Sequence, residues 1–247
     1  MIEQDLILEG KVSLVTGGSR GIGLGIAKYL GMMKSTVVIA DIDLKAAEEA
    51  CFNLSKEKID AIPMYVDIGD YDSIRKLVGA IYKKLDKIDI LVNNAGVFDS
   101  RPIPEIKPDE WVKLLEININ GMHYCSQIVI EKMIEQKSGK IVNLSSMSYQ
   151  TGGLKAGVNY TTSKAAVVGL TRSYARYCAP YGITVNAVAP GLIKSEMTKS
   201  WADPSLVPMG YLGEPLDVAR VVYFLCSPLS DYVTGQLISI NGGMVFN

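Results

Sequence analysis

Short apolar runs alternate with longer stretches of helical periodicity along the whole chain. Runs typical of buried strands lie at 11–16, 36–40, 62–66, 88–92, 139–144, 182–188 and 236–240. Helical patterns lie between them, at about 21–31, 43–56, 70–86, 108–136, 158–179 and 215–227. This alternation predicts an α/β fold with a parallel sheet of about seven strands. Helices should cover both faces of that sheet, and ligands should bind at the carboxyl ends of its strands.

The size and composition of the chain fit one such unit. Its 247 residues are 48% hydrophobic, which is enough for a large core, and we expect a single domain over 1–247. The formal net charge of −1 provides no basic surface for nucleic acid. No apolar run approaches the ~20 residues that span a bilayer, and residues 1–5 lack the basic start of a signal peptide. We therefore expect a cytoplasmic protein with no membrane partner.

The cysteines and the single histidine argue against disulfides and metal sites. Cys51, Cys125, Cys178 and Cys226 are scattered without paired spacing, which is typical of reduced structural thiols in a cytosolic protein. One histidine, His123, cannot form a His-rich metal site. We expect it to be a packed or surface helix residue and expect no metal.

A glycine-rich turn at 17–23 (GGSRGIG) separates the first predicted strand from a helical pattern. A strand, a glycine turn and a helix place backbone N–H groups and a helix N-terminus against a pyrophosphate, as in the Rossmann-type doubly wound fold. Glycine lets the backbone approach the ligand without an intervening Cβ. The spacing of Gly17, Gly21 and Gly23 differs from G-x-G-x-x-G, so a plain strand-to-helix turn is the alternative.

Asp41 follows the second predicted strand, 18 residues after Gly23. This is close to the spacing at which an acid binds the adenosine ribose hydroxyls, and a carboxylate there repels a 2′-phosphate. The residue therefore favours NAD over NADP. Arg20 argues weakly for NADP, because a guanidinium in the turn can pair with a phosphate. The alternatives are a helix N-cap for Asp41 and a solvated surface charge for Arg20.

Polar residues also follow other predicted strands. They are Asp67 after 64–66, Asn93-Asn94-Ala95-Gly96 after 90–92, Ser145-Ser146-Met147-Ser148 after 141–144, and Pro190-Gly191 after 185–189. A carboxylate at Asp67 either reaches the adenine amino group or caps a helix, and the paired asparagines can hydrogen-bond neighbouring strands. The serines are otherwise ordinary turn residues. Asn118 interrupts an apolar helical run, so it either faces solvent or marks a local kink whose freed carbonyl holds water.

Tyr160 and Lys164 lie four residues apart at the start of a helical pattern. Four residues are just over one turn, so the phenol and the ammonium share a helix face. A cation beside the phenol favours the phenolate and would make Tyr160 an acid/base near neutral pH. Chance pairs of this spacing are common, so the other motifs give the pair its value.

The order of these motifs resembles the classical short-chain dehydrogenase/reductase family over about 8–245. The resemblance depends on Thr16-Gly17-x-x-x-Gly21-x-Gly23, Asn93-Asn94-Ala95-Gly96, Asn118, Ser145-Ser146, Tyr160-x-x-x-Lys164 and Pro190-Gly191. The tail 234–244 is similar to the branch containing 3-oxoacyl-(acyl-carrier-protein) reductases and bacterial sugar, polyol and steroid dehydrogenases. The resemblance implies an oxidoreductase that interconverts a ketone and a secondary alcohol and forms a tetramer through helices 108–136 and 158–179. Its cofactor is expected to be NAD(H), because of Asp41, with NADP(H) as the alternative.

Roles for individual residues follow from the resemblance. Tyr160 is the acid in ketone reduction and the base in alcohol oxidation; Lys164 binds the nicotinamide ribose and lowers the tyrosine pKa. Ser146 hydrogen-bonds the substrate oxygen, and Asn118 holds a water that links Lys164 to solvent. Ser148 is the lesser candidate for the serine role. The implied cofactor contacts are Gly17, Ser19, Arg20, Gly21, Ile22, Gly23, Asp41, Asp67, Ile68, Asn94, Ala95, Gly96, Tyr160, Lys164, Pro190, Gly191 and Ile193.

The segment 198–213 departs from the family pattern. It is short and contains two prolines, which predicts an abbreviated lid with at most a short helix. Trp201 either contacts substrate or anchors the lid, and Leu154 and Val158 are candidates for the pocket lining. These residues favour a neutral or acyl-type ketone. A non-catalytic dinucleotide-sensing protein is the alternative outside the enzyme class; an extended epimerase or dehydratase would need a longer chain.

Overall fold

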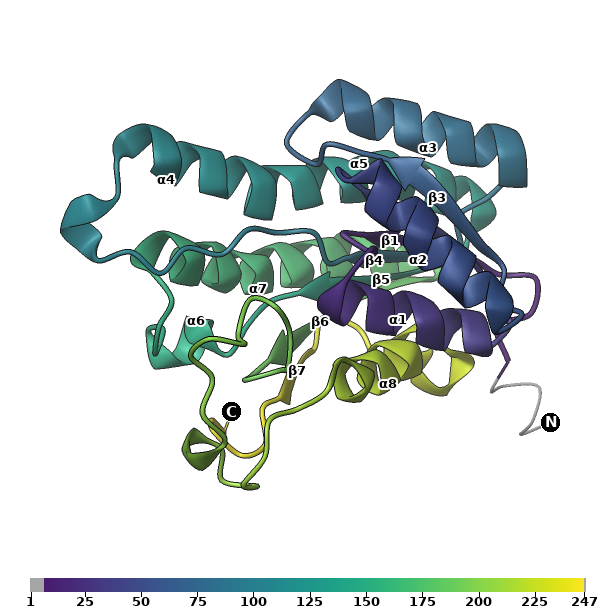
Figure 1. Cartoon of the computed structure of the whole chain (residues 1–247). Helices are drawn as coiled ribbons and strands as arrows, with labels where there is room; N and C mark the ends of the chain where they lie inside the picture. The colour runs from purple at the N-terminus through teal and green to yellow at the C-terminus, as the bar shows by residue number, and fades with distance from the viewer. Residues whose placement is uncertain (1–6, 247) are drawn as a thin grey trace.

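The computed structural model describes residues 7–246, and its central feature is a seven-stranded parallel sheet (Figure 1). The strands are β1 (Val12–Thr16), β2 (Thr36–Asp41), β3 (Ala61–Tyr65), β4 (Ile90–Asn93), β5 (Gly139–Leu144), β6 (Ile183–Pro190) and β7 (Leu237–Ile240). They lie in the order β3-β2-β1-β4-β5-β6-β7, and every neighbouring pair is parallel. The predicted doubly wound α/β fold is confirmed.

Helices connect these strands at the predicted places. They are α1 (Gly21–Met32), α2 (Leu44–Lys56), α3 (Tyr71–Leu85), α4 (Pro108–Leu115), α5 (Gly121–Gln136), α6 (Ser148–Thr151), α7 (Val158–Cys178) and α8 (Pro215–Cys226). The helix expected over 108–136 is divided, because a π-helical turn, Glu116–Asn120, joins α4 to α5. The local irregularity offered as one alternative at Asn118 is therefore a π turn. The one-turn helix α6 is too short for the sequence pattern to reveal.

Two hydrophobic layers cover the two faces of the sheet. Successive strand side chains point to opposite faces, so Val15 and Ile39 pack with α1, α2 and α8, while Leu14 and Val38 pack with α3, α5 and α7. None of these four side chains is exposed. Burial on both faces explains why the strands read as continuous apolar runs.

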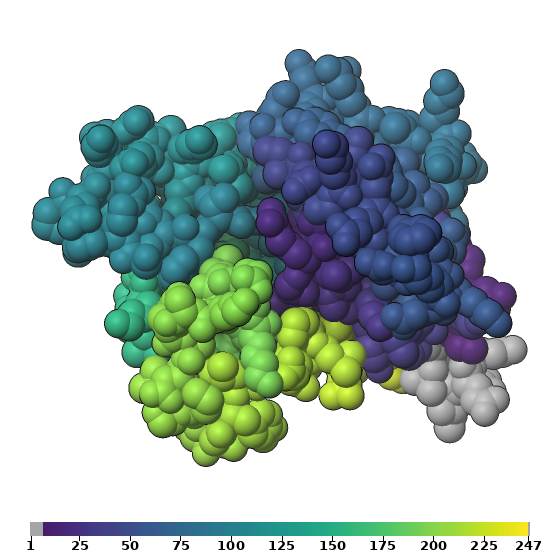
Figure 2. Space-filling model, in the orientation of Figure 1, coloured from purple at the N-terminus to yellow at the C-terminus, as the bar shows by residue number. Residues whose placement is uncertain are grey.

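The strand order reverses between β1 and β4, which pair through Ser13–Ile90, Leu14–Leu91 and Val15–Val92. In doubly wound sheets the loops leave such a point in opposite directions and leave a crevice at the carboxyl ends. Figure 2 shows the surface hollowed where the green segment after β6 meets the purple N-terminal part of the chain. The fold therefore places the crevice beside the glycine turn and beneath the loop that follows β6.

Candidate active site

The glycine turn after β1 is packed too tightly for side chains. A Cβ on Gly23 would lie 2.1 Å from the carbonyl oxygen of Gly17 and 2.5 Å from Nδ2 of Asn94. Gly17 has a φ of +62° and Gly21 a φ of +54°, which glycine adopts without strain. Nδ2 of Asn94 donates to the carbonyls of Thr16 (3.0 Å) and Gly17 (2.8 Å). The asparagine after β4 thus joins the two strands that flank the crevice.

Asp41 lies at the end of β2 and is buried, with 5% of its surface exposed. Its Oδ2 accepts hydrogen bonds from the hydroxyl (2.6 Å) and the backbone N–H (3.2 Å) of Ser19 in the glycine turn. Asp41 does not cap α2; the side chain of Asp43 does, by accepting from the N–H of Ala46. The carboxylate is consequently held against the glycine turn.

Asp67 does not cap a helix either. Its Oδ1 accepts from the N–H of Gly69 at 2.9 Å, and Asp70 is the residue that caps α3. The N-cap alternative offered for Asp41 and Asp67 is therefore wrong at both positions.

Lys164 is held by the end of β5 at both its side chain and its backbone. Its Nζ donates to the carbonyl of Leu144 at 2.8 Å, and the hydroxyl of Ser145 donates to its carbonyl at 2.7 Å. Nζ lies 5.6 Å from the ring centroid of Tyr160, so the predicted shared helix face is confirmed. Ser146, from the same strand end, hydrogen-bonds the Tyr160 side chain. One strand end and one helix turn therefore bring the serine, the tyrosine and the lysine together.

Burial determines the titration behaviour of this group. Burial raises the pKa of Tyr160, and the hydrogen bond with Ser146 opposes that shift only in part. Burial also lowers the pKa of Lys164 from 10.5 to about 8. Without a dinucleotide, desolvation disfavours both charged forms, so the role of Lys164 in lowering the pKa of the phenol stays a prediction for the cofactor-bound enzyme.

Asn118 lies in the π turn and is completely buried. Its Oδ1 accepts from the N–H of Val97 (2.8 Å), and its Nδ2 donates to the carbonyl of Val97 (3.0 Å) and to the hydroxyl of Ser163 (3.0 Å). That hydroxyl donates in turn to the carbonyl of Tyr160 at 2.7 Å. The solvent-facing alternative for Asn118 is wrong: its side chain joins the loop after β4 to the helix turn between Tyr160 and Lys164.

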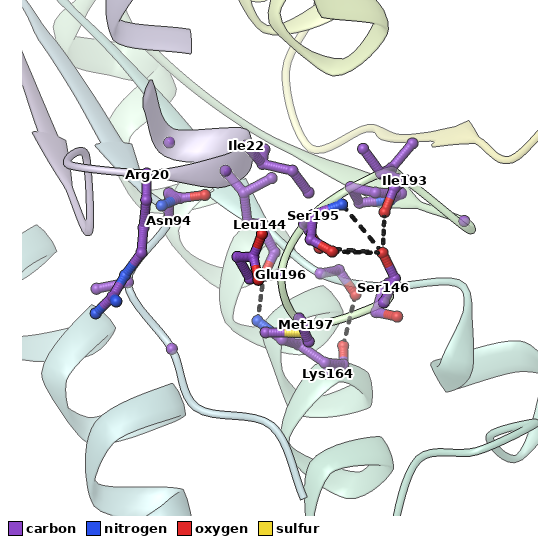
Figure 3. A pocket seen from close by; sticks show the side chains of 18 of the residues that line it. Arg20, Ile22, Asn94, Leu144, Ser146, Lys164, Ile193, Ser195, Glu196 and Met197 are labelled. Carbon is purple, nitrogen blue, oxygen red and sulfur yellow. Dashed lines mark hydrogen bonds between the residues drawn. The ribbon is translucent and has the colours of Figure 1, made fainter. Parts of the chain in front are cut away.

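A cavity of about 450 Å³ lies at the carboxyl ends of the strands. Thirteen of the predicted residues line it: Arg20, Gly21, Ile22, Gly23, Asn94, Ala95, Gly96, Ser146, Tyr160, Lys164, Pro190, Gly191 and Ile193. Gly17, Ser19, Asp41, Asp67, Ile68 and Asn118 do not. Figure 3 shows Arg20 and Asn94 at one end of the cavity and Ser146 and Ile193 at the other, with the nitrogen of Lys164 directed toward the carbonyl of Leu144.

Sequence reasoning missed six lining residues: Leu144, Ser145, Ser195, Glu196, Met197 and Thr198. The last four lie shortly after the Pro190-Gly191 bend. Their position after this bend is the sequence signal that could have identified them as lining residues. Thr198 stabilises this segment, because its hydroxyl donates to the carbonyl of Ile193 at 2.6 Å.

A second cavity, of about 700 Å³, lies between the loop after β4, the start of α7 with the residues before it, and Trp201. Leu154, Val158 and Trp201 line this second cavity, and none of the three lines the cavity that contains Tyr160. The Trp201 ring stacks on Phe98 at 6.2 Å, and Phe98 packs edge-on against Tyr160 at 5.0 Å. Nε1 of Trp201 donates to the carbonyl of Met197, which lines the first cavity. Trp201 thus both anchors the lid and faces a cavity next to the tyrosine.

The remaining candidate groups lie outside both cavities. All four cysteines are buried and free, and burial raises the pKa of Cys125 and Cys226 to about 12. Nδ1 of His123 lies 2.6 Å from the hydroxyl of Tyr174 on α7, so it is a packed helix residue. Over residues 7–246, no cluster of metal-ligating side chains occurs and no helix is long and apolar enough to cross a membrane.

Comparison with known proteins identifies the family of the chain. The sequence model of the short chain dehydrogenase family matches residues 11–205. A 3-oxoacyl-(acyl-carrier-protein) reductase from Aquifex aeolicus is 40% identical, covering 97% of this chain and 99% of its own. A crystal structure of such a reductase with bound NAD, from Brucella melitensis, is 33% identical with a TM-score of 0.91, covering 99% of this chain and 95% of its own. A putative gluconate dehydrogenase from Agrobacterium tumefaciens is 28% identical with a TM-score of 0.93, each chain being covered to 97%.

The chain belongs to the short-chain dehydrogenase/reductase family. It is an oxidoreductase, and the family binds a nicotinamide dinucleotide.

Proposed function

We propose that this oxidoreductase interconverts a ketone and a secondary alcohol, with NAD(H) as the hydride carrier and Tyr160 as the acid and base. One observation carries the proposal: Ser146, Tyr160 and Lys164 line the same cavity as the glycine turn. A nucleotide on the turn and a carbonyl beside the tyrosine would then lie within one space. Holding reactants in this way supplies a large part of the rate enhancement of such reactions.

The residues of the cavity fit a dinucleotide. The Cβ-free backbone at Gly17 and Gly23 and the N-terminus of α1 suit a pyrophosphate. Gly96 is also closely packed, because a Cβ there would lie 3.1 Å from Oδ1 of Asn118 and 3.7 Å from Nζ of Lys164. The turn would hold the phosphates, and Lys164 the nicotinamide ribose. The bound dinucleotide supplies the hydride chemistry, and the protein supplies binding, orientation and electrostatics.

The protein's own groups would move the proton. In reduction, the hydroxyl of Ser146 donates to the substrate oxygen and stabilises the charge that develops there. Tyr160 gives its phenolic proton to that oxygen, and the ammonium of Lys164 stabilises the resulting phenolate. Asn118, within the π turn, would hold the path by which a proton reaches Lys164 from solvent. In alcohol oxidation the same transfers run in reverse.

The cofactor preference depends on Asp41. Its carboxylate is buried against Ser19, so a 2′-phosphate in the same place would meet an unscreened negative charge. We expect a lower dissociation constant for NADH than for NADPH. Asp41→Asn keeps an oxygen acceptor for Ser19 and removes the charge. It should therefore reduce the difference between the dissociation constants for NADH and NADPH. Tighter binding of NADPH by the unaltered protein would contradict the assignment.

The second cavity supports a substrate that extends beyond its ketone. It adjoins the aromatic stack on Tyr160 and is lined by apolar groups of Leu154, Val158 and Trp201. A 3-oxoacyl thioester would place its carbonyl at Tyr160 and its chain in this space. The names of the relatives favour the same class. Sugar, polyol, diol or steroid ketones are the second candidate, favoured by the likeness to the putative gluconate dehydrogenase.

A substrate screen tests the function. Acetoacetyl thioesters, diketones, sugars and steroid ketones are assayed with NADH and with NADPH, and Tyr160→Phe is the matched control. We expect turnover of at least one neutral or acyl ketone and its loss in the variant. Equal turnover by the variant would instead favour a dinucleotide-sensing protein.

We also propose a cytoplasmic homotetramer. Buried thiols with raised pKa values suit a reducing compartment, and α4, α5 and α7 form one side of the molecule (Figure 1). Exposed apolar groups on this side include Val112 and Tyr177. Sedimentation as a monomer at micromolar concentration would contradict the tetramer.

A further inference from the structure

A second set of polar contacts lies just outside the cavity, at the N-terminus of α7. Nδ2 of Asn159 donates to Oδ2 of Asp99 at 2.8 Å. Oδ1 of the same amide accepts from the backbone N–H of Tyr160, also at 2.8 Å. Asn159 has no exposed surface. One buried amide therefore joins a carboxylate in the loop after β4 to the backbone of the tyrosine.

Asp99 is itself held by several donors. Nε and Nη2 of Arg101 donate to its two carboxylate oxygens at 3.0 and 2.7 Å, and the N–H of Arg101 donates at 2.9 Å. The N–H of Gly157, just before α7, donates to its carbonyl at 2.7 Å. The Arg101 guanidinium holds the pKa of Asp99 well below its usual range. Arg101 also pairs with Glu110 on α4 at 2.7 Å. The carboxylate is fixed and ionised.

The first turn of α7 has little other support for its N–H groups. Its N-cap is Gly157, which has no side chain to accept from them. Asn159 supplies an acceptor from within the turn, and the charge of Asp99 lies at the positive end of the helix dipole. A Cβ on Gly157 would lie 2.9 Å from Oδ1 of Asn159. The glycine therefore leaves the space that the amide occupies.

We propose that Asp99 and Asn159 are positioning residues for Tyr160. They fix the first turn of α7 and with it the direction of the phenol toward Ser146. Phe98, the neighbour of Asp99, packs edge-on against the tyrosine ring, so the same loop contacts both the backbone and the ring of Tyr160. The inference rests on the proposed function, in which Tyr160 transfers the proton. Neither positioning residue lines the cavity.

Exchange of the two groups tests this role. Asn159→Asp places a second carboxylate against Asp99, and we expect kcat to fall about 10- to 100-fold while the dissociation constant for NADH changes less than twofold. Asp99→Asn alone keeps an oxygen acceptor for Asn159 and should cost less, about two- to fivefold. The double variant, Asp99→Asn with Asn159→Asp, again contains one amide and one carboxylate and should recover most of kcat. Glu110→Gln is the control: it removes the charge of the outer ion pair with Arg101, leaves the contacts of Asp99 in place, and should leave kcat unchanged.

A spectroscopic readout separates positioning from the proposed reaction. In protein carrying ¹³C at the tyrosine ζ position, the signal that disappears in Tyr160→Phe belongs to Tyr160. Asn159→Asp should shift the pH titration of this signal, and the exchanged pair should restore it, whether or not a substrate is known. Unchanged kcat and an unchanged titration in Asn159→Asp would overturn the inference. A double variant that has the wild-type Tm but recovers neither kcat nor the titration would overturn it as well. If wild-type protein reduces no ketone, the proposed function fails and the titration still decides the positioning role.

Discussion

The two sides of the active-site cavity are held together in different ways. On the nucleotide side, bonds join residues far apart in sequence, such as Asn94 with Gly17 and Asp41 with Ser19. On the lid side, the hydrogen bonds described for 195–202 join partners within five residues. Met197 there is 47% exposed, whereas Asp41 is 5% exposed. Long-range packing constrains residue types strongly and local turns constrain them weakly, so we expect cofactor binding to depend on the nucleotide side and substrate choice on the lid side.

The largest expected effect is at the point where the two sides meet. Tyr160→Phe removes the proton donor and keeps the ring that packs on Phe98. We expect kcat for ketone reduction to fall by about 10²- to 10⁴-fold, with the dissociation constant for the dinucleotide unchanged. Steady-state kinetics and a fluorescence titration measure the two quantities. A loss of dinucleotide affinity equal to the loss of kcat would show that the tyrosine acts in dinucleotide binding and not in proton transfer.

Gly23→Ala tests the tightness of the nucleotide side. The new methyl would overlap the carbonyl oxygen of Gly17 at 2.1 Å, so the turn must move. We expect dinucleotide affinity to fall about 100-fold and the free energy of unfolding to fall by about 1–3 kcal/mol. Gly79→Ala is the control, because a Cβ there meets nothing within 4 Å. It should leave binding unchanged and stabilise α3 by up to about 1 kcal/mol. Similar behaviour of the two variants would refute the packing argument.

Lys164→Met reports the cost of burying a charge at this site. The folded pKa of about 8 lies below the unfolded value of 10.5, so between these pH values the unfolded chain binds more protons. The free energy of unfolding of the wild type therefore rises with pH across this window. The variant lacks this pH-dependent cost of burying a charge, which is worth up to about 3 kcal/mol. It also loses the hydrogen bond to Leu144, which reduces the gain. It should be more stable than wild type at pH 7, and the difference should shrink toward pH 10.5. Urea denaturation that gives a pH-independent difference would contradict the prediction.

The smallest effect is expected on the lid side. Trp201→Ala removes the ring that stacks on Phe98 and lines the second cavity. We expect KM for long or bulky ketones to change about three- to tenfold, with the dinucleotide dissociation constant unchanged. Trp201→Phe retains an aromatic ring, so its KM should lie between those of the wild type and Trp201→Ala. An equal change for the smallest ketone would mean that the tryptophan acts only as an anchor.

Much of the fold could be predicted because it depends on burial. Strands buried on both faces, such as β2, are apolar throughout and can be recognised without knowing their neighbours. The catalytic candidates could be predicted for a related reason: Tyr160 and Lys164 need a fixed spacing within one helix. The four-residue helix α6 could not be predicted, because one turn carries no periodicity.

The remaining errors at the site concern quantities that depend on the folded environment. The pKa of Tyr160 depends on desolvation, which spacing does not reveal. The roles of Asp43 and Asp70 as caps, in place of Asp41 and Asp67, depend on which carboxylate faces the helix end. Ser195 and Glu196 line the cavity through the path of a loop without regular structure. Such features are set by tertiary contacts.

The π turn between α4 and α5 fixes the phase of a long helical stretch. An α-helix rotates by about 100° per residue, so the extra residue in 116–120 offsets the buried position Leu114 of α4 from the buried series of α5. Deleting one residue there would permit a continuous α-helix but would turn one half against the other by the same angle. Either Asn118 would leave Val97 or Val129 would leave the core. The length of this stretch therefore cannot change by one residue without displacing every side chain on one side of the change.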